Sequence, residues 1–323
     1  MLARRIYYTM KPVVPWSIRI ALRRWRACQI RKKFKHVWPI SDSAGKPPLD
    51  WAGWPNGKKF AFILTHDVEG EKGYNKVGQL AEMERHLGFR SSFNFVPEGE
   101  YRVQRALREE LERGGFEVGV HDLHHDGKLY NSQSVFHKRA QRIKGYLREW
   151  NAVGFRSAFM LHNLDWLGEL EVLYDASTFD IDPFEPQPGG VNTIFPFWVP
   201  GKDGKGFVEL PYTLAQDSTL FLILRAQDIE IWKTKIDWIA ERGGMVLVNV
   251  HPDYVRFENG SSERATFLAA HYEALLRYIQ QRYQGEFWAP LPKELAMWFK
   301  DKHESKSAPS CTGRPGANLN GTH

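Results

Sequence analysis

The sequence lacks any apolar run that approaches the ~18–20 uninterrupted residues of a membrane span. It also begins without the continuous apolar segment of a signal peptide, so we expect a cytoplasmic protein. Cysteine is scarce: Cys28 and Cys311 are the only two, and both lie in terminal regions where a disulfide would add little to a core. We therefore predict free thiols and a fold held by apolar packing, for which 323 residues, 42% of them hydrophobic, suffice.

Acidic residues are absent before Asp42, whereas eleven lysines and arginines precede it. Such a segment could lie on an anionic bilayer with its tryptophans and aliphatic side chains at the interface, could follow phosphates, or could be a solvated extension. Paired zinc-ligand spacings and aromatic RNA-binding signatures are missing, so we expect no specific nucleic-acid partner. Residues 1–40 are a candidate for peripheral contact with an anionic membrane at its inner face.

The composition divides the chain into three parts. Residues 1–56 form the basic extension and a connector, "KPPLDWAGWPNG", whose turn formers and tryptophans predict a segment clamped onto the domain surface. Residues 57–301 form the folded domain. Residues 302–323 are rich in small and polar residues, which predicts a disordered tail.

The central part alternates short apolar runs with longer amphipathic stretches. "FAFILT", "SSFNFV", "FEVGVH" and "VLVNVH" are typical of strands, and stretches such as "NKVGQLAEMERHLG" and "QRALREELERGG" are typical of helices. About seven strands separated by helices predict an α/β fold, either a distorted (β/α) barrel or a doubly wound open sheet. In both folds the functional residues lie at the carboxyl ends of the strands.

Three of the apolar runs end in residues suited to metal binding or acid–base chemistry. The carboxyl ends of parallel strands meet at one rim, so we expect these residues to converge. They are His66-Asp67-Val68-Glu69, His121-Asp122-Leu123-His124-His125 and His251-Pro252-Asp253.

His121 and His125 are four residues apart, a spacing that can place two imidazoles on one side of a helical turn. A carboxylate from the neighbouring strand end would complete a set of three ligands. Two histidines and one carboxylate leave positions on a divalent ion open for water, as hydrolysis requires.

The order of "THDVEG", "EVGVHDLHH", "GFRSAF", "YDASTFDIDPFEPQPGG" and "VLVNVHPDY" resembles the ordered motifs of the polysaccharide deacetylase family, carbohydrate esterases related to chitooligosaccharide deacetylases. The resemblance covers roughly residues 58–299. It implies a distorted (β/α) barrel that binds a divalent metal ion, usually Zn²⁺. It also implies removal of an acetyl group from an N-acetylated sugar of a polysaccharide or glycan intermediate.

The resemblance also implies roles for individual residues. His121 and His125 match the two metal histidines of the family, and His251 matches the general acid that protonates the leaving amine. In the first motif, "DVE" replaces the commoner pair of adjacent aspartates. We therefore expect Asp67 to be the general base and Glu69 the third metal ligand, with Asp67 on the metal as the alternative.

The third motif supplies two further candidates. Arg156 matches the arginine that holds the base carboxylate, and the backbone N–H of Phe159 matches a donor to the oxyanion. Ala158 stands where the family usually has proline. The family partner of His251 is an aspartate of the fourth motif, for which Asp175, Asp180 and Asp182 are the candidates.

Two histidines in these motifs are expected to stay outside the chemistry. We predict that His124 supports its loop and that His66 has a packing or supporting role.

Other functions fit the same motifs. The scaffold could hydrolyse another C–N bond or an O-acetyl ester. With Val68 and Ala158 as departures from the family pattern, it could also be a catalytically reduced protein that binds or assembles glycans.

Overall fold

The computed structural model describes residues 15–201, 205–257 and 265–307. Within them, nine strands form one sheet in which every neighbouring pair is parallel except β6 with β7. The strands are β1 (Phe60–Val68), β2 (Ser92–Phe95), β3 (Glu117–His121), β4 (Gly154–Arg156), β5 (Tyr174–Asp175), β6 (Phe197–Pro200), β7 (Gly206–Glu209), β8 (Met245–Asn249) and β11 (Phe287–Trp288). A separate small sheet pairs β9 (Val255–Arg256) with β10 (Phe267–Leu268).

The sheet curls into a barrel that a non-strand segment closes. β1 pairs with β8 along residues 61–65 and with β2 along residues 65–68. From β2 the sheet continues through β3, β4 and β5 to β7. The chain after β7 then returns to β8, where the N–H groups of Thr213 and Leu214 donate to the carbonyl of Leu247 at 3.1 and 3.3 Å. The predicted distorted (β/α) barrel is confirmed, and the distortion lies at this closure.

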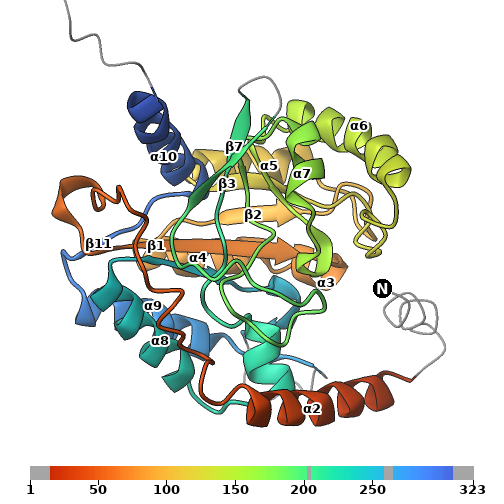
Figure 1. The fold of residues 1–323 in the computed structure, drawn as a ribbon. Coiled ribbons are helices and arrows are strands. Elements are labelled where there is room, and N and C mark those ends of the chain that lie inside the picture. Colours follow the sequence, from red (N-terminus) through yellow and green to blue (C-terminus); the bar gives the residue numbers. More distant parts are fainter. Residues whose placement is uncertain (1–14, 202–204, 258–264, 308–323) are drawn as a thin grey trace, which may run out of the picture.

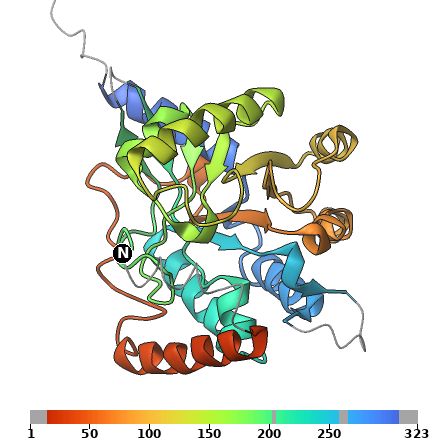
Figure 2. The ribbon, with the colours of Figure 1, turned by 90° about the vertical axis from the view of Figure 1, so that its right-hand side faces the viewer.

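Helices cover the outside of the sheet (Figures 1 and 2). The α-helices are α2 (Trp16–Lys33), α3 (Glu71–Tyr74), α4 (Val77–His86), α5 (Arg105–Arg113), α6 (Gln133–Glu149), α7 (Leu164–Leu167), α8 (Glu230–Arg242), α9 (Ala269–Arg282) and α10 (Pro292–Ser307). Short 3₁₀ turns are η1 (Pro55–Gly57), η2 (Ala158–Met160), η3 (Gly168–Leu170) and η6 (Pro252–Tyr254), and η5 (Ser218–Ile223) is a turn of π-helix. None of the helices in the described ranges combines the length and apolarity needed to cross a bilayer.

Two apolar cores explain why the strands are apolar along their whole length. One core fills the barrel interior and includes Ala61, Ile63 and Leu247. The other lies between sheet and helices and includes Phe62 and Leu64. Successive residues of β1 therefore enter opposite cores, and all nine residues of the strand are buried, as expected of a parallel strand covered on both faces.

The chain before the barrel packs onto it. Trp54 is buried, and its indole N–H donates to the carbonyl of Gly243 at 2.9 Å. Trp51 stacks edge-on against Trp54 with ring centroids 4.7 Å apart. The connector is thus clamped onto the domain surface as predicted. At the other end α10 runs to Ser307, past the expected domain limit, while Cys311 and the rest of the predicted tail lie outside the described residues.

Candidate active site

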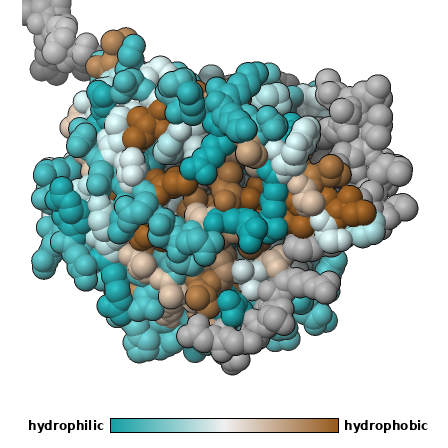
Figure 3. All heavy atoms as spheres, turned by 90° about the horizontal axis from the view of Figure 1, so that it is seen from below, coloured by the Kyte–Doolittle hydropathy of each residue, from teal (hydrophilic) through white to brown (hydrophobic). Residues whose placement is uncertain are grey.

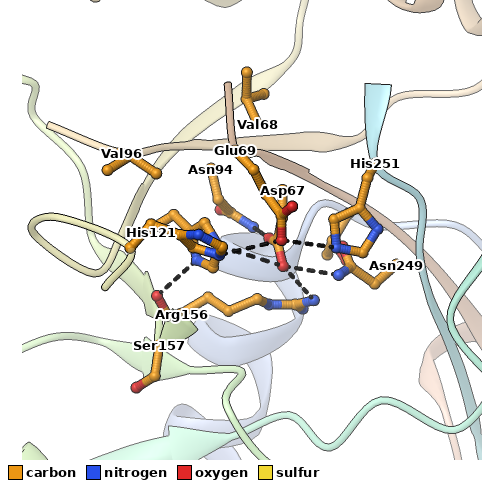
Figure 4. Close-up of polar contacts among 12 residues, drawn as sticks. Asp67, Val68, Glu69, Asn94, Val96, His121, Arg156, Ser157, Asn249 and His251 are labelled. Atoms are coloured by element: carbon orange, nitrogen blue, oxygen red, sulfur yellow. Dashed lines mark hydrogen bonds and ion pairs between the residues drawn. The ribbon is translucent and has the colours of Figure 1, made fainter. Parts of the chain in front are cut away.

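The end of β1 delivers two carboxylates to the same side of the sheet. Asp67 lies within the strand, beside Asn94 of β2, and Glu69 follows directly after it. Val68 is fully buried in the core between sheet and helices. Because side chains alternate along a strand, Asp67 and Glu69 point together into the rim of the barrel (Figure 4).

Asp67 is held by amides and by a cation. The side-chain amide of Asn94 donates to Oδ1 at 3.0 Å and that of Asn249 donates to Oδ2 at 2.7 Å. The Arg156 guanidinium, completely buried, lies 3.6 Å from Oδ2. Burial would raise the pKa of Asp67, but Arg156, His121, His251 and Asn94 together lower it to about 2. The carboxylate is therefore fixed and ionised at neutral pH.

A glycine makes room for one of these amides. Asn94 lies beside Gly119 of β3, and a Cβ atom at Gly119 would come within 2.2 Å of the Asn94 side-chain oxygen. That contact is far shorter than any real Cβ contact. Glycine in the run "EVGVH" thus allows the Asn94 side chain to reach Asp67.

Glu69, His121 and His125 form a cluster of possible metal ligands. One ligand atom from each lies within 4.8 Å of the other two, and Oε1 of Glu69 is 3.1 Å from Nε2 of His125. The Nδ1–H of His121 donates to the carbonyl of Arg156 at 3.0 Å, which leaves the lone pair on Nε2 facing the cluster. Nε2 of both histidines is buried without a hydrogen-bond donor to it. Two imidazoles and a carboxylate around a small gap fit a divalent ion of the zinc type.

Burial and neighbouring charges shift the pKa values of all three residues in the cluster. Burial would raise the pKa of Glu69, but His125 above all, with His251 and His121, holds it well below its usual value. Burial lowers the pKa of His121. Burial also opposes the charged form of His125, yet the neighbouring Glu69 raises its pKa.

The loops that carry His125 and Phe159 have unusual backbone conformations. Asp122, His125 and Phe159 all have positive φ angles, near 55°, 51° and 57°. For residues with a Cβ atom this conformation is uncommon, and it recurs at functional sites. The rings of His125 and Phe159 lie 4.5 Å apart, so the predicted oxyanion turn borders the ligand cluster.

Asp253 and Tyr254 fix the position of Glu69. The Asp253 carboxylate accepts the backbone N–H groups of Glu69 and Gly70, each at 2.9 Å, and of Gly73 at 3.2 Å. The Tyr254 hydroxyl donates to Oε2 of Glu69 at 2.8 Å. The segment after β8 thus holds the turn that follows β1.

His251 is paired with Asp217. Its Nδ1–H donates to Oδ1 of Asp217 at 2.6 Å, and its backbone N–H donates to Oδ2 at 2.8 Å. Nε2 faces the site, 3.7 Å from Oε1 of Glu69. Burial would lower the pKa of His251, but Asp217, Glu69 and Asp67 together raise it to about 10. The imidazole is therefore protonated at neutral pH.

The prediction that Asp175, Asp180 or Asp182 is the partner of His251 is wrong. Asp175 accepts the hydroxyl of Ser177 at 2.7 Å, Asp180 forms an ion pair with Lys235, and Asp182 accepts the backbone N–H of Phe184 at 2.8 Å. Their segment packs beside β7. The aspartate that reaches the end of β8 comes instead from the start of η5, which follows the barrel closure.

His66 and His124 behave as expected. His66 is fully buried on the helix side of β1 and contacts the carbonyl of Val250 at 2.9 Å and Oε1 of Glu84 at 2.7 Å. His124 contacts Glu98 through the backbone carbonyl at 3.3 Å and the side chain at 3.5 Å, so it holds its loop.

Asn94, Asn249, Tyr254 and Asp217 shape the site but were not predicted as part of it, and Asp253 was expected at the rim without a role of its own. Asn94 and Asn249 each interrupt an apolar strand with an amide near its carboxyl end, and this interruption is a usable signal. Asp253 follows His251 in a run already singled out. Asp217 is signalled only by the helix-capping pattern "QDST", in which its side chain accepts the N–H of Ser218.

No protein-family model matches the sequence, and no curated protein does. Among solved structures, a Mycobacterium smegmatis protein described as a polysaccharide deacetylase matches with a TM-score of 0.56 at 18% identity, over 84% of this chain and 99% of its own. The peptidoglycan deacetylase PdaC of Bacillus subtilis follows with 0.44 at 14% identity, over 79% of this chain and 96% of its own. A Bordetella bronchiseptica protein described as a polysaccharide deacetylase involved in O-antigen biosynthesis matches with a TM-score of 0.42 at 16% identity. The match covers 76% of this chain and 93% of its own.

Proposed function

The chain has the fold of a polysaccharide deacetylase, and we propose that it is a metal-dependent hydrolase that removes the acetyl group from an N-acetylated sugar of a glycan. The observation that carries the proposal is the convergence of Glu69, His121 and His125, with Asp67 and His251 beside them. Two histidines and a carboxylate leave coordination positions open, which suits hydrolysis rather than a structural role. Zn²⁺ is the ion that this ligand set favours.

When bound, the metal ion supplies positive charge that polarises the acetyl carbonyl and acidifies water. Asp67 is ionised and lies 4.0 Å from His121, so it can take a proton from water that attacks next to the ligand cluster. Asn94, Asn249 and Arg156 keep its two oxygens in place, so the proton acceptor is already oriented when substrate arrives.

His251 fits the opposite role. Its imidazole is protonated and its Nε2 faces the cluster, so it can give a proton to the departing nitrogen. Asp217 holds Nδ1 and thereby sets which nitrogen faces the substrate. The contact of the Phe159 ring with His125 supports the assignment of the Phe159 N–H as a donor to the developing oxyanion.

Acetate release from a panel of compounds tests this function. The protein, reconstituted with Zn²⁺, is assayed on N-acetylated amino sugars and oligosaccharides, on O-acetylated sugars and on cyclic amides. Release from the N-acetylated compounds alone supports the proposal. Preference for an ester or a cyclic amide would assign another C–O or C–N hydrolase to the same residues. Binding of glycans that persists without metal, and without turnover on any compound, would indicate the catalytically reduced protein instead.

A further inference from the structure

Helix α2 has two apolar faces. The spacing of Ile20 and Ala27 places them on one side of the helix, and both are buried. Ile18, Leu22 and Trp25 follow the spacing of the other side, and their exposed fractions are 50%, 58% and 66%. A helix that only covers a protein core needs one apolar stripe, so the second one requires its own explanation.

The inner face of α2 packs against η5, the element that follows Asp217. Ile20 and Ala27 cluster with Ile223 of η5, against which Phe184 and Leu224 also pack. The guanidinium of Arg24 donates to the carbonyl of Leu222 at 3.0 Å. Since η5 starts directly after Asp217, the helix rests on the element that carries the partner of His251.

A chain of polar side chains runs to the site from Glu185, the residue after Phe184. Glu185 accepts the side-chain amide of Gln216 at 2.6 Å, and the oxygen of that amide lies 3.5 Å from Asn249, which holds Asp67. Burial and the neighbouring Asp182 raise the pKa of Glu185 to about 7, whereas Arg23 of α2 acts to lower it. Because Phe184 packs against the cluster of Ile20, Ala27 and Ile223, α2 lies beside the loop that carries Glu185, below the barrel in Figures 1 and 2.

The outer face of α2 combines apolar and cationic side chains. The helix contains seven arginines and lysines and no acidic residue. Besides the half-buried Arg19 and Arg24, all of them are exposed: Arg23, Arg26, Arg31, Lys32 and Lys33. Figure 3, which views the molecule from below, shows apolar patches bordered by hydrophilic atoms. A Trp/Leu/Ile stripe with cationic flanks is typical of helices that lie in the headgroup region of anionic membranes.

We propose that Ile18, Leu22 and Trp25 insert into an anionic lipid bilayer, so that the site receives a glycan carried on a lipid of that same bilayer. The apolar stripe supplies the insertion, and the flanking arginines and lysines pair with lipid phosphates. Because the opposite side of α2 rests on η5, docking turns the side of the barrel that carries η5 toward the membrane surface. The substrate class rests on the proposed deacetylase function, whereas the docking itself does not.

Vesicle flotation of the full chain tests the docking. Vesicles of phosphatidylcholine with 30% phosphatidylglycerol are compared with pure phosphatidylcholine, and a Leu22→Ser/Trp25→Ser variant is compared with Met297→Ser as control. Met297 is also exposed, at 48%, but lies on α10. We expect the wild type and Met297→Ser to float with the anionic vesicles, and the double variant to lose at least about tenfold in partitioning. Equal flotation of the double variant and wild type would overturn the proposal.

If the outer face of α2 binds nucleic acid or a second copy of the chain instead of a membrane, the experiments give different results. Binding of a DNA duplex without flotation would assign the cationic residues to nucleic acid. A dimer that the double variant cannot form, again without flotation, would assign the stripe to a second copy of the chain. Either result overturns the membrane proposal.

The substrate class needs a separate readout. Initial rates are measured on an N-acetylglucosaminyl lipid in anionic vesicles and on a water-soluble N-acetylated oligosaccharide. The double variant should lose rate at least about tenfold on the lipid substrate, in proportion to its lost partitioning, and keep its rate on the soluble one. Equal rates of both proteins on the lipid substrate would overturn the inference. Flotation without acetate release from any substrate would refute the deacetylase function and leave the docking standing.

Discussion

Asp217 forms two hydrogen bonds with His251: its carboxylate accepts the ring Nδ1–H at 2.6 Å and the backbone N–H at 2.8 Å. This double contact fixes the rotation of the imidazole as well as the position of the strand end that carries it. Within the described residues, the Asp217 carboxylate accepts hydrogen bonds from His251 and from the backbone N–H of Ser218, so we expect it to act on the reaction through His251.

Removing the two residues of this pair singly and together should give non-additive effects. His251→Ala is expected to lower kcat by about 10²–10⁴-fold, the contribution of a general acid. Asp217→Asn should cost less, and the double variant should be no slower than His251→Ala alone, because Asp217 acts through the imidazole. The measurement is kcat with bound metal quantified for each variant. If the losses multiplied in the double variant, Asp217 would have a separate role.

The metal content of two variants can show which carboxylate of the first motif, Asp67 or Glu69, binds the metal ion and which accepts the proton. Glu69→Ala should lose the metal ion during dialysis, because Glu69 belongs to the cluster whose ligand atoms lie within 4.8 Å. Asp67→Asn should keep the ion and lose turnover, since Asp67 is held by Asn94, Asn249 and Arg156. Metal content is read by mass spectrometry. The opposite pattern would make Asp67 the ligand.

His124 and His125 provide a matched pair of variants. His125→Ala removes a member of the ligand cluster and should abolish metal binding and activity together. His124→Ala removes a histidine from the same loop whose contacts are with Glu98, and should keep the metal ion and most of the activity. Isothermal titration with Zn²⁺ compares the two. Similar losses in both variants would point to disruption of the loop rather than loss of a ligand.

Glu117 should make stability depend on pH. Its carboxyl is buried at the start of β3, between the Tyr174 hydroxyl at 2.9 Å and the N–H of Lys293 at 3.0 Å, and burial raises its pKa to about 7. The folded protein therefore keeps a proton that the unfolded chain releases near pH 4.5, and the free energy of unfolding falls as pH rises from about 4.5 to 7. Above pH 7 the penalty is up to about 3 kcal/mol.

Glu117→Gln replaces the carboxyl by a neutral group of the same shape. Urea unfolding at pH 5 and pH 8 should give similar stabilities for the two proteins at pH 5. At pH 8 the variant should be the more stable by about 1–3 kcal/mol. If the variant were destabilised equally at pH 5 and pH 8, the glutamate would contribute to stability through its hydrogen bonds, and ionisation of its buried carboxyl would not lower the free energy of unfolding.

The local pattern of the sequence was sufficient for the strands β1, β2, β3 and β8 and for the convergence of side chains at their carboxyl ends. The apolar run that ends at Leu64 enters both cores, and a parallel strand with two covered faces has this appearance. Asp67, Glu69 and His121 are then placed by the alternation of side chains and by the common direction of neighbouring strands. Each of these placements depends on short-range geometry, which sequence spacing encodes.

The position of Asp217 could not be predicted from local sequence patterns, because it depends on a long-range contact. Asp217 reaches His251 because Thr213 and Leu214 cross to β8 and close the barrel, a contact between segments more than 30 residues apart. The crossing lies after β7, in a segment without a periodic pattern from which it could be read, and the chain between β5 and β7 is irregular too. The aspartates of the same irregular stretch, Asp175, Asp180 and Asp182, look equally suitable in sequence, and burial directs them to other partners.

The closure of the barrel by Thr213 and Leu214 has a consequence for how the molecule loses function. Along this seam β8 is joined to the chain by a few hydrogen bonds to Leu247 and not by a strand ladder. The same segment leads directly to Asp217 and to η5, on which α2 rests. Opening of the seam would therefore detach the partner of His251 while the ladder from β1 to β7 stayed intact, so amide hydrogens near residues 213–223 should exchange before those of β1. Inactivation can in this way precede unfolding.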